Sequence, residues 1–205
     1  MTQHPGAFGD TPGPGAFGDT PDPGARVPLL PLGTVVWLSS EVTFFGSLFA
    51  AYFTLRATTP GPWPPAGVEL ETAVTGLATL LLVASSGTVQ LAVRAIAAGD
   101  RARFRRYLVM TAALAVVFLA NQAREWSVAS FGPASHGYGS AFFVMTGFHG
   151  AHVTGGVIAM AVLLGRSGGA GFGAEATDAV EVLSYYWHFV DVVWVVMFAT
   201  LFLFP

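Results

Sequence analysis

Apolar residues in this chain fall into five long runs, separated by short polar or glycine- and proline-rich links. Each run has the ~20 residues that an α-helix needs to cross a bilayer. Helices are the expected form, because an isolated strand would leave its backbone groups unpaired in lipid. The pattern therefore predicts an all-α polytopic membrane protein over residues 31–205, with five transmembrane helices at about 32–55, 72–97, 107–128, 139–164 and 180–204.

Residues 1–30 have a different character. The segment Gly6–Pro12, which reads GAFGDTP, recurs as Gly15–Pro21. A repeat so rich in glycine and proline can bury almost nothing, so we expect a disordered tail. The tail also lacks the basic start and apolar core of a signal peptide.

Composition agrees with a membrane protein and excludes several functions. The chain is 53% hydrophobic and 10% charged, whereas soluble domains carry about a quarter charged residues. A net charge of −3 gives no reason to expect nucleic-acid binding. The absence of cysteine excludes disulfides, thiolate metal sites and cysteine nucleophiles.

The arginines predict the orientation. If the five helices alternate in direction, two arginines, Arg56 and Arg124, lie on one side of the membrane and seven lie on the other. Basic links stay in the cytoplasm, so we expect the N-terminus inside and the C-terminus outside. The cytoplasmic arginines next to helices two and three are candidates for binding anionic lipid. Trp63, in the proline-rich link on the outer side, suits the membrane interface and is a further lipid-binding candidate. The seven cytoplasmic arginines are Arg26, Arg94, Arg101, Arg103, Arg105, Arg106 and Arg166.

Two carboxylates lie deep inside predicted spans. Glu41 is in the first span and Asp191 is near the middle of the fifth. A charged group in mid-bilayer costs roughly 2.5–3.5 kcal/mol on insertion scales, so each needs a partner or a function. Glu41 is either a structural carboxylate bonded to a histidine or hydroxyl, or a protonatable functional group. His188 and Asp191 are three residues apart and share a helix face, which favours a structural His–Asp unit.

The fourth run contains His149 and His152, which also share one helix face. A stripe of small residues beside them would let another helix approach closely: Gly147, Ala151, Gly155 and Ala159. The histidines can be hydrogen-bonded packing residues, because a neutral imidazole can cross-link helices. They can also contact lipid phosphate or handle protons.

Two other classes of protein remain open from the residues alone. His149, His152 and His188 offer three nitrogens for the haem or metal of a membrane electron carrier, although no Glu-x-x-His motif accompanies them. Glu41 and Asp191 could serve a proton-coupled transporter. Transporters usually carry internal repeats within the membrane, and the clear repeat here is in the tail.

Longer motifs go further. The segments 137–143 (GYGSAFF) and 146–153 (TGFHGAHV) resemble a signature of subunit III of haem–copper cytochrome c oxidases, and so does 186–194 (YWHFVDVVW). The run 40–45 (SEVTFF) is similar to the family's helix with a buried glutamate. The links 63–67 (WPPAG) and 99–101 (GDR) match the family's loops in order. The resemblance covers about residues 32–205 and is closest to a five-helix bacterial form.

The resemblance implies a non-catalytic, non-redox subunit of a terminal oxidase in the bacterial plasma membrane. The complex would pass electrons from cytochrome c to oxygen and pump protons. Haem and copper would lie on partner subunits, with no metal here. The chain would flank the catalytic subunit I, bind phospholipid and sustain proton uptake, and a respiratory supercomplex is a further setting. Glu41 matches the family's reactive membrane glutamate. The family's buried polar positions fall on His149, His152, His188 and Asp191. Many members have seven helices and a lipid-filled cleft, whereas this chain has the later five.

Overall fold

A computed structural model describes residues 29–169 and 174–205. The predicted N-terminal tail and its repeat lie outside the described residues. Within the described part, five helices are long and apolar enough to cross a membrane. This confirms the predicted all-α fold with five spans. The helices are α1 (Leu29–Thr58), α2 (Thr72–Ala97), α3 (Arg101–Val128), α4 (Gly137–Arg166) and α5 (Ala174–Phe198), and a π-helical turn, η1 (Ala199–Leu203), follows α5.

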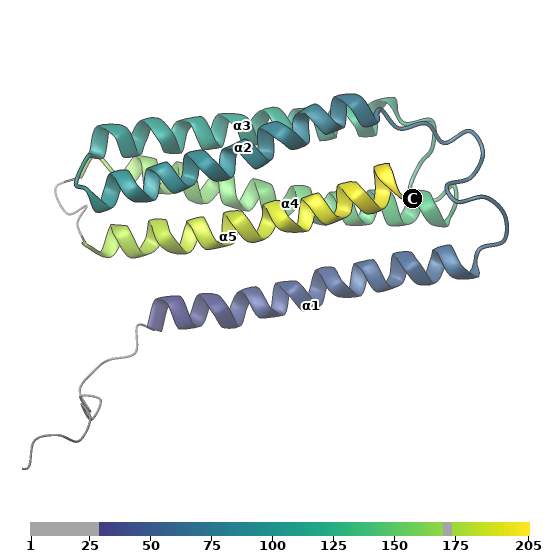
Figure 1. The fold of residues 1–205 in the computed structure, drawn as a ribbon, viewed down its shortest axis with the longest axis horizontal. Helices are drawn as coiled ribbons and strands as arrows, with labels where there is room; N and C mark the ends of the chain where they lie inside the picture. Colours follow the sequence, from purple (N-terminus) through teal and green to yellow (C-terminus); the bar gives the residue numbers. More distant parts are fainter. Residues whose placement is uncertain (1–28, 170–173) are drawn as a thin grey trace, which may run out of the picture.

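Helices α2 to α5 form a bundle, and α1 lies along one side of it (Figure 1). Successive helices run in opposite directions. Helix α1 packs against α4 and α5. The rest of its surface is open, with Val36 66% and Val42 59% exposed. Apolar side chains exposed to this extent suit lipid or another transmembrane subunit.

The third helix starts earlier than predicted. It begins at Arg101 instead of about residue 107, so the link from α2 is short. Gly99 has φ of 73°, a conformation that ends a helix readily when the residue is glycine. Asp100 then caps α3 by accepting a hydrogen bond from the Arg103 backbone N–H at 2.9 Å. The arginine-rich segment is therefore the first turns of a helix and not a loop.

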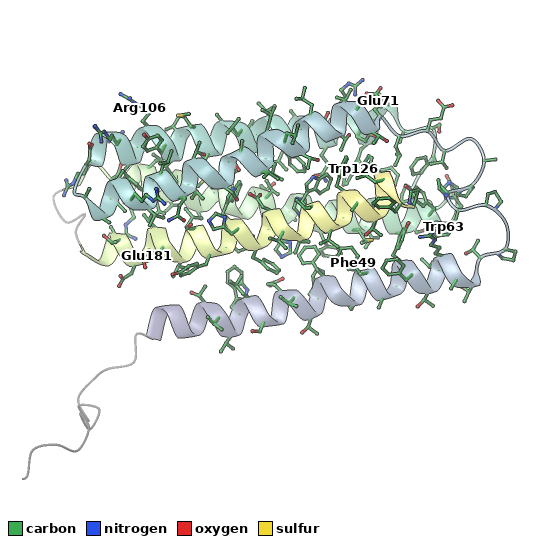
Figure 2. The ribbon with its side chains drawn as sticks, viewed as in Figure 1. Phe49, Trp63, Glu71, Arg106, Trp126 and Glu181 are labelled. Atoms are coloured by element: carbon green, nitrogen blue, oxygen red, sulfur yellow. The ribbon has the colours of Figure 1, made fainter. Side chains whose placement is uncertain are left out.

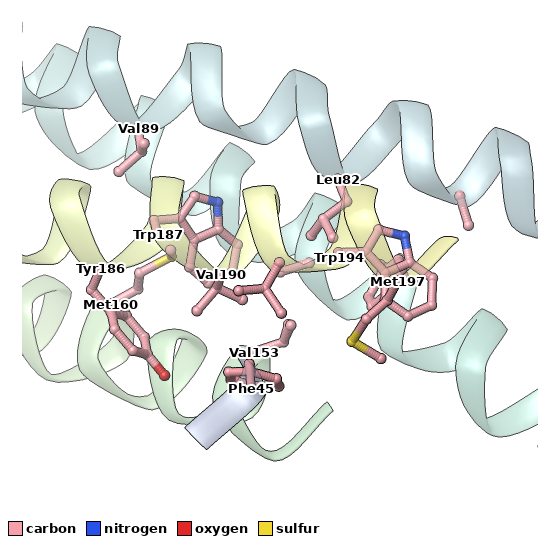
Figure 3. Close-up of a cluster of buried hydrophobic side chains, with 14 of the residues drawn as sticks. Phe45, Leu82, Val89, Val153, Met160, Tyr186, Trp187, Val190, Trp194 and Met197 are labelled. Carbon is pink, nitrogen blue, oxygen red and sulfur yellow. The ribbon is translucent and has the colours of Figure 1, made fainter. Parts of the chain in front are cut away.

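The centre of the bundle is apolar and aromatic (Figure 3). Trp187 and Trp194 from α5 are almost completely buried there. Their indole N–H groups donate to hydroxyls of α2, Trp187 to Ser85 Oγ at 2.8 Å and Trp194 to Thr79 Oγ1 at 2.9 Å. A buried indole usually finds such a partner, because an unpaired polar group is costly inside a bundle.

Close contacts on α4 do not follow the predicted stripe of small residues. Ala151 and Gly155 of that stripe are exposed. The tightest contacts of this part of α4 fall instead at Gly150 and Gly156, where a Cβ would lie 2.7 Å from Gln122 Nε2 and 2.5 Å from the Trp187 ring. The predicted close approach of another helix along the stripe was therefore wrong for the helices of this chain. The close contacts are at Gly150 and Gly156, where large side chains, and not a neighbouring backbone, lie against the helix.

Candidate functional site

The strongest polar contact between α1 and the bundle joins Glu41 to His152. Glu41 Oε2 lies 3.1 Å from His152 Nε2, and the side chains are 19% and 18% exposed. The other ring nitrogen, Nδ1, lies 2.7 Å from the Phe148 carbonyl oxygen. A carbonyl oxygen only accepts hydrogen bonds, so Nδ1 carries a hydrogen. A neutral His152 therefore has a bare Nε2, which accepts a hydrogen bond from a protonated Glu41.

Two pairings with zero total charge fit this contact. One is a protonated Glu41 beside a neutral His152, and the other is a carboxylate facing an imidazolium. A neutral pair avoids the cost of an isolated charge at membrane depth. The arrangement is compatible with both alternatives that the sequence left open for Glu41, a structural carboxylate bonded to a histidine and a protonatable functional group.

Aromatic rings surround this pair. Phe45 meets the His152 ring edge-on with centroids 5.0 Å apart, and Trp37 stacks on Tyr186 at 5.1 Å. The Tyr186 hydroxyl donates to the His152 carbonyl at 2.8 Å. The residues of α1 in these contacts recur every four residues, so they lie on one face of the helix. That face fixes α1 onto α4 and α5.

His149 has different surroundings, although it is only one turn away. It is completely buried, and its ring lies 4.8 Å from Trp194 and 5.7 Å from Phe118, centroid to centroid. Neither ring nitrogen has a hydrogen-bond partner within the described part of the chain. Of the two histidines that were candidates to bond Glu41, His152 makes the contact and His149 does not.

Asp191 and His188 do not bond each other directly. Both contact the hydroxyl of Ser86 on α2, which lies 2.9 Å from His188 Nδ1 and within hydrogen-bond distance of Asp191 Oδ2. Asp191 is 5% exposed, and its other oxygen has no partner. The predicted His–Asp unit is therefore a three-residue cluster. Ser86 is one of several hydroxyl-bearing residues of the second span, and nothing in the sequence singled it out.

The candidate ligands for haem or metal are not brought together. His152 bonds α1, His188 bonds α2, and His149 lies among the rings of α3 and α5. Across residues 29–169 and 174–205, no group of three His, Asp or Glu side chains has the geometry to hold a metal ion. Glu41 and Asp191, the pair considered for a transporter, likewise bond different helices.

A second polar cluster lies where α2 begins and α3 ends. Glu125 is 4% exposed and accepts hydrogen bonds from the Glu71 backbone N–H at 3.2 Å and from Thr75 Oγ1 at 3.3 Å. Gln122, one turn earlier, donates to the Thr146 carbonyl at 2.6 Å. Both residues lie toward the end of the predicted third span, and no signal in the sequence indicated that Glu125 would be buried.

An ion pair flanks this cluster at the surface. Arg124 donates to both carboxylate oxygens of Glu71, one of them at 2.9 Å. Glu71 precedes α2 and is exposed. The hydrogen bonds from Arg124 lower the pKa of Glu71 below its ordinary value. The pair holds the chain entering α2 against the last turns of α3.

The arginine candidates for lipid binding gather at one end of the bundle. Arg106 is at that end and Trp63 is at the opposite end (Figure 2). Trp63 donates its indole N–H to the Tyr52 hydroxyl at 3.0 Å and packs on Tyr138, so much of it faces the protein. Trp63 therefore does not share a site with the arginines. The exposed arginines at the other end are Arg94 in the last turn of α2, and Arg101, Arg103, Arg105 and Arg106 in the first turns of α3.

The fold and these polar contacts define a polytopic helical membrane protein with buried ionisable groups paired across helices. The family model "Cytochrome c oxidase subunit III" matches residues 26–205. The chain therefore belongs to the cytochrome c oxidase subunit III family.

Several relatives carry the same description. The chain is 45% identical over 180 residues to a probable cytochrome c oxidase subunit 3 of Mycobacterium tuberculosis, covering 86% of this chain and 89% of the relative. It is 40% identical to cytochrome c oxidase subunit 3 of Corynebacterium diphtheriae, with the same coverage. The identity to the subunit 3 of Thermostichus vulcanus is 38%, over 84% of this chain and 86% of that one. The chain is thus similar to these three relatives over 86–89% of their length.

Proposed function

We propose that this chain is the accessory, non-redox subunit of its oxidase. Haem and copper lie on the catalytic subunit I, and this chain supports that subunit from its side. The proposal rests on the contacts of the three histidines that were candidate ligands for haem or metal. His152 and His188 are engaged in hydrogen bonds, and His149 is enclosed by aromatic rings. Side chains arranged in this way hold helices together and position protons.

The partners are subunit I and the other oxidase subunits, in a bacterial plasma membrane and in any respiratory supercomplex built on that oxidase. An affinity tag on this chain, used in mild detergent, should recover a haem–copper catalytic subunit. The open surface of α1, with its exposed valines, is suited to such contacts. Recovery of the chain alone, from membranes that contain active oxidase, would contradict the proposal.

The Glu41–His152 pair is proposed as a proton-holding group. The shared proton is proposed to sit on Glu41, because a neutral acid beside a neutral imidazole places less charge at membrane depth than a carboxylate beside an imidazolium. Infrared spectra of the intact complex test this. The Glu41→Gln variant should lack one band of a protonated carboxyl group. Loss of an ionised carboxylate band at pH 7 would refute the assignment.

The arginine-rich end is proposed to face the cytoplasm and to bind anionic phospholipid, which helps to hold this subunit on the catalytic one. The test is to replace Arg101, Arg103, Arg105 and Arg106 by glutamine and to measure bound lipid and co-purified catalytic subunit. The same positions changed to lysine keep the charge and are the matched control. Less lipid and a looser complex in the glutamine variant alone would support the proposal. Equal values in both variants would overturn it.

A further inference from the structure

The hydroxyl of Ser86 can donate its hydrogen in either of two directions. A serine hydroxyl has one hydrogen to donate, and here it faces two groups, His188 Nδ1 and Asp191 Oδ2. If the hydroxyl donates to Asp191, then His188 must donate to Ser86, and Asp191 is either an anion or an acid with its proton on Oδ1, where that proton has no acceptor among the described residues. If the hydroxyl donates to His188, then Asp191 must donate to Ser86 and all three groups are neutral.

The surroundings favour the neutral arrangement. All three residues lie well inside the spans of α2 and α5. Asp191 is only 5% exposed, and among the described residues its Oδ1 has no hydrogen-bond partner. An unpartnered oxygen is costly on a carboxylate and much less costly as the carbonyl oxygen of a neutral acid.

Among the residues that the structure describes, no cation is in place to offset a charge on Asp191. Helix α3 meets α5 where the Phe118 ring lies 4.7 Å from the Trp194 ring, centroid to centroid, and its charged side chains are near its two ends: Arg101, Arg103, Arg105 and Arg106 at one, Arg124 and Glu125 at the other. The other helices packed against α5 are α1, α2 and α4. The ionisable histidine, glutamate and arginine side chains on the described parts of these helices are either occupied or close to a helix end. They are Glu41 and His152, which bond each other, His149, which lies between the rings of Phe118 and Trp194, and Arg56, Arg94 and Arg166, each in the last turn of its helix.

We propose that Asp191, Ser86 and His188 form a directed proton relay. Asp191 donates its proton to Ser86 Oγ, and Ser86 donates to His188 Nδ1. The remaining hydrogen of His188, on Nε2, has no hydrogen-bond partner among the residues that the structure describes. His188 is only partly buried, at the seam between α2 and α5. The buried acid is thus connected to the surface of the bundle through one hydroxyl.

Transfer along this relay balances without any other reactant. The O–H bond of Asp191 breaks as a new O–H bond forms on Ser86, and the original Ser86 O–H bond breaks as an N–H bond forms on His188 Nδ1. The products are an Asp191 carboxylate and a His188 imidazolium. Release of the Nε2 proton then needs a base, either a water molecule or a side chain of a partner subunit that reaches Nε2, and without one the reverse transfers restore the neutral cluster. The relay is separate from the Glu41–His152 pair and does not depend on it.

Infrared spectroscopy of the intact oxidase complex tests the relay. The difference between wild type and Asp191→Asn should contain the band of a protonated carboxyl group. In Ser86→Ala that band should move to higher frequency, because the acid loses its acceptor. On transfer to heavy water, exchange of the Asp191 proton should be slower in Ser86→Ala than in wild type. Ser86→Thr keeps a hydroxyl and should behave as wild type.

Two results would overturn the proposal. One is a carboxylate band, instead of an acid band, lost in Asp191→Asn. The other is an unchanged exchange rate in Ser86→Ala. If Ser86→Ala does not assemble, the direction of the relay can be read from nitrogen-15 spectra of histidine-labelled complex, using the signals lost in His188→Gln. A bare Nδ1 supports the relay, and an Nδ1–H contradicts it.

Discussion

The contact between Gly156 and Trp187 allows a sharp prediction about packing. A Cβ added at Gly156 would lie 2.5 and 2.8 Å from two atoms of the Trp187 ring. The ring is fully buried, and its N–H is held by Ser85 at 2.8 Å, so it cannot move away without losing that bond. Gly156→Ala should therefore strongly destabilise the bundle.

The size of the effect follows from two contributions. Overpacking of a well-packed interior typically costs about 1–3 kcal/mol. An interhelical hydrogen bond in a membrane protein contributes about 0.6 and at most about 1.7 kcal/mol, and part of this is lost if the ring shifts. We expect a loss of about 1–3 kcal/mol in unfolding free energy, which is about a 5- to 150-fold change in the unfolding equilibrium constant.

The assay is unfolding of the purified protein in detergent micelles, followed by circular dichroism. The matched control is Gly87→Ala on α2, because a Cβ at Gly87 meets nothing within 4 Å. That change should be neutral or stabilising by up to about 1 kcal/mol, since alanine favours helix more than glycine does. Replacing Trp187 by phenylalanine should relieve the cost of Gly156→Ala, because the smaller ring does not reach the new methyl group. Equal stability of the two alanine variants would refute the reasoning.

Three other predictions concern the two ends of the bundle. Glu71 has a lowered pKa, so its bond with Arg124 stabilises the start of α2 at neutral pH and is lost as pH falls through the folded-state pKa; protection of the amides there against hydrogen exchange, taken relative to the intrinsic rate at each pH, should fall on acidification in wild type and be low at every pH in Arg124→Gln. Tyr138 donates to the Leu201 carbonyl at 2.7 Å, so Tyr138→Phe should speed hydrogen exchange in η1, while unchanged exchange would disagree with that role. An impermeant maleimide added to whole spheroplasts should label Ala66→Cys and not Ala98→Cys, and the reverse pattern would invert the proposed orientation.

The five spans could be predicted because the length of an apolar run depends on bilayer thickness and hardly at all on tertiary contacts. The start of α3 could not. A cluster of arginines looks like a loop, and only the positive φ of Gly99 and the cap from Asp100 show that the helix begins there. The arginine-rich segment is helical because arginine is a good helix former and because the segment lies beyond the apolar centre of the bundle.

The polar contacts were predictable in kind but not in detail. His149 and His152 are three residues apart and lie on the same face of α4, so the sequence alone could not show which of them contacts Glu41. The packing of α1 beside α4 and α5 decides in favour of His152. Ser86 was missed as a bridge because a single hydroxyl in an apolar helix carries no distinctive signal. Its role depends on the placement of α2 against α5.

The central claim is that this subunit's buried histidines and carboxylates bond across helices or pack against aromatic rings, and hold no redox group. The most direct measurement is the haem and metal content of the chain after it has been stripped from the purified oxidase, alongside the content of the oxidase that remains. The account predicts no haem absorption and no bound metal on the separated chain, with all haem and copper kept by the rest of the complex. Haem or copper leaving in proportion to this chain would contradict it.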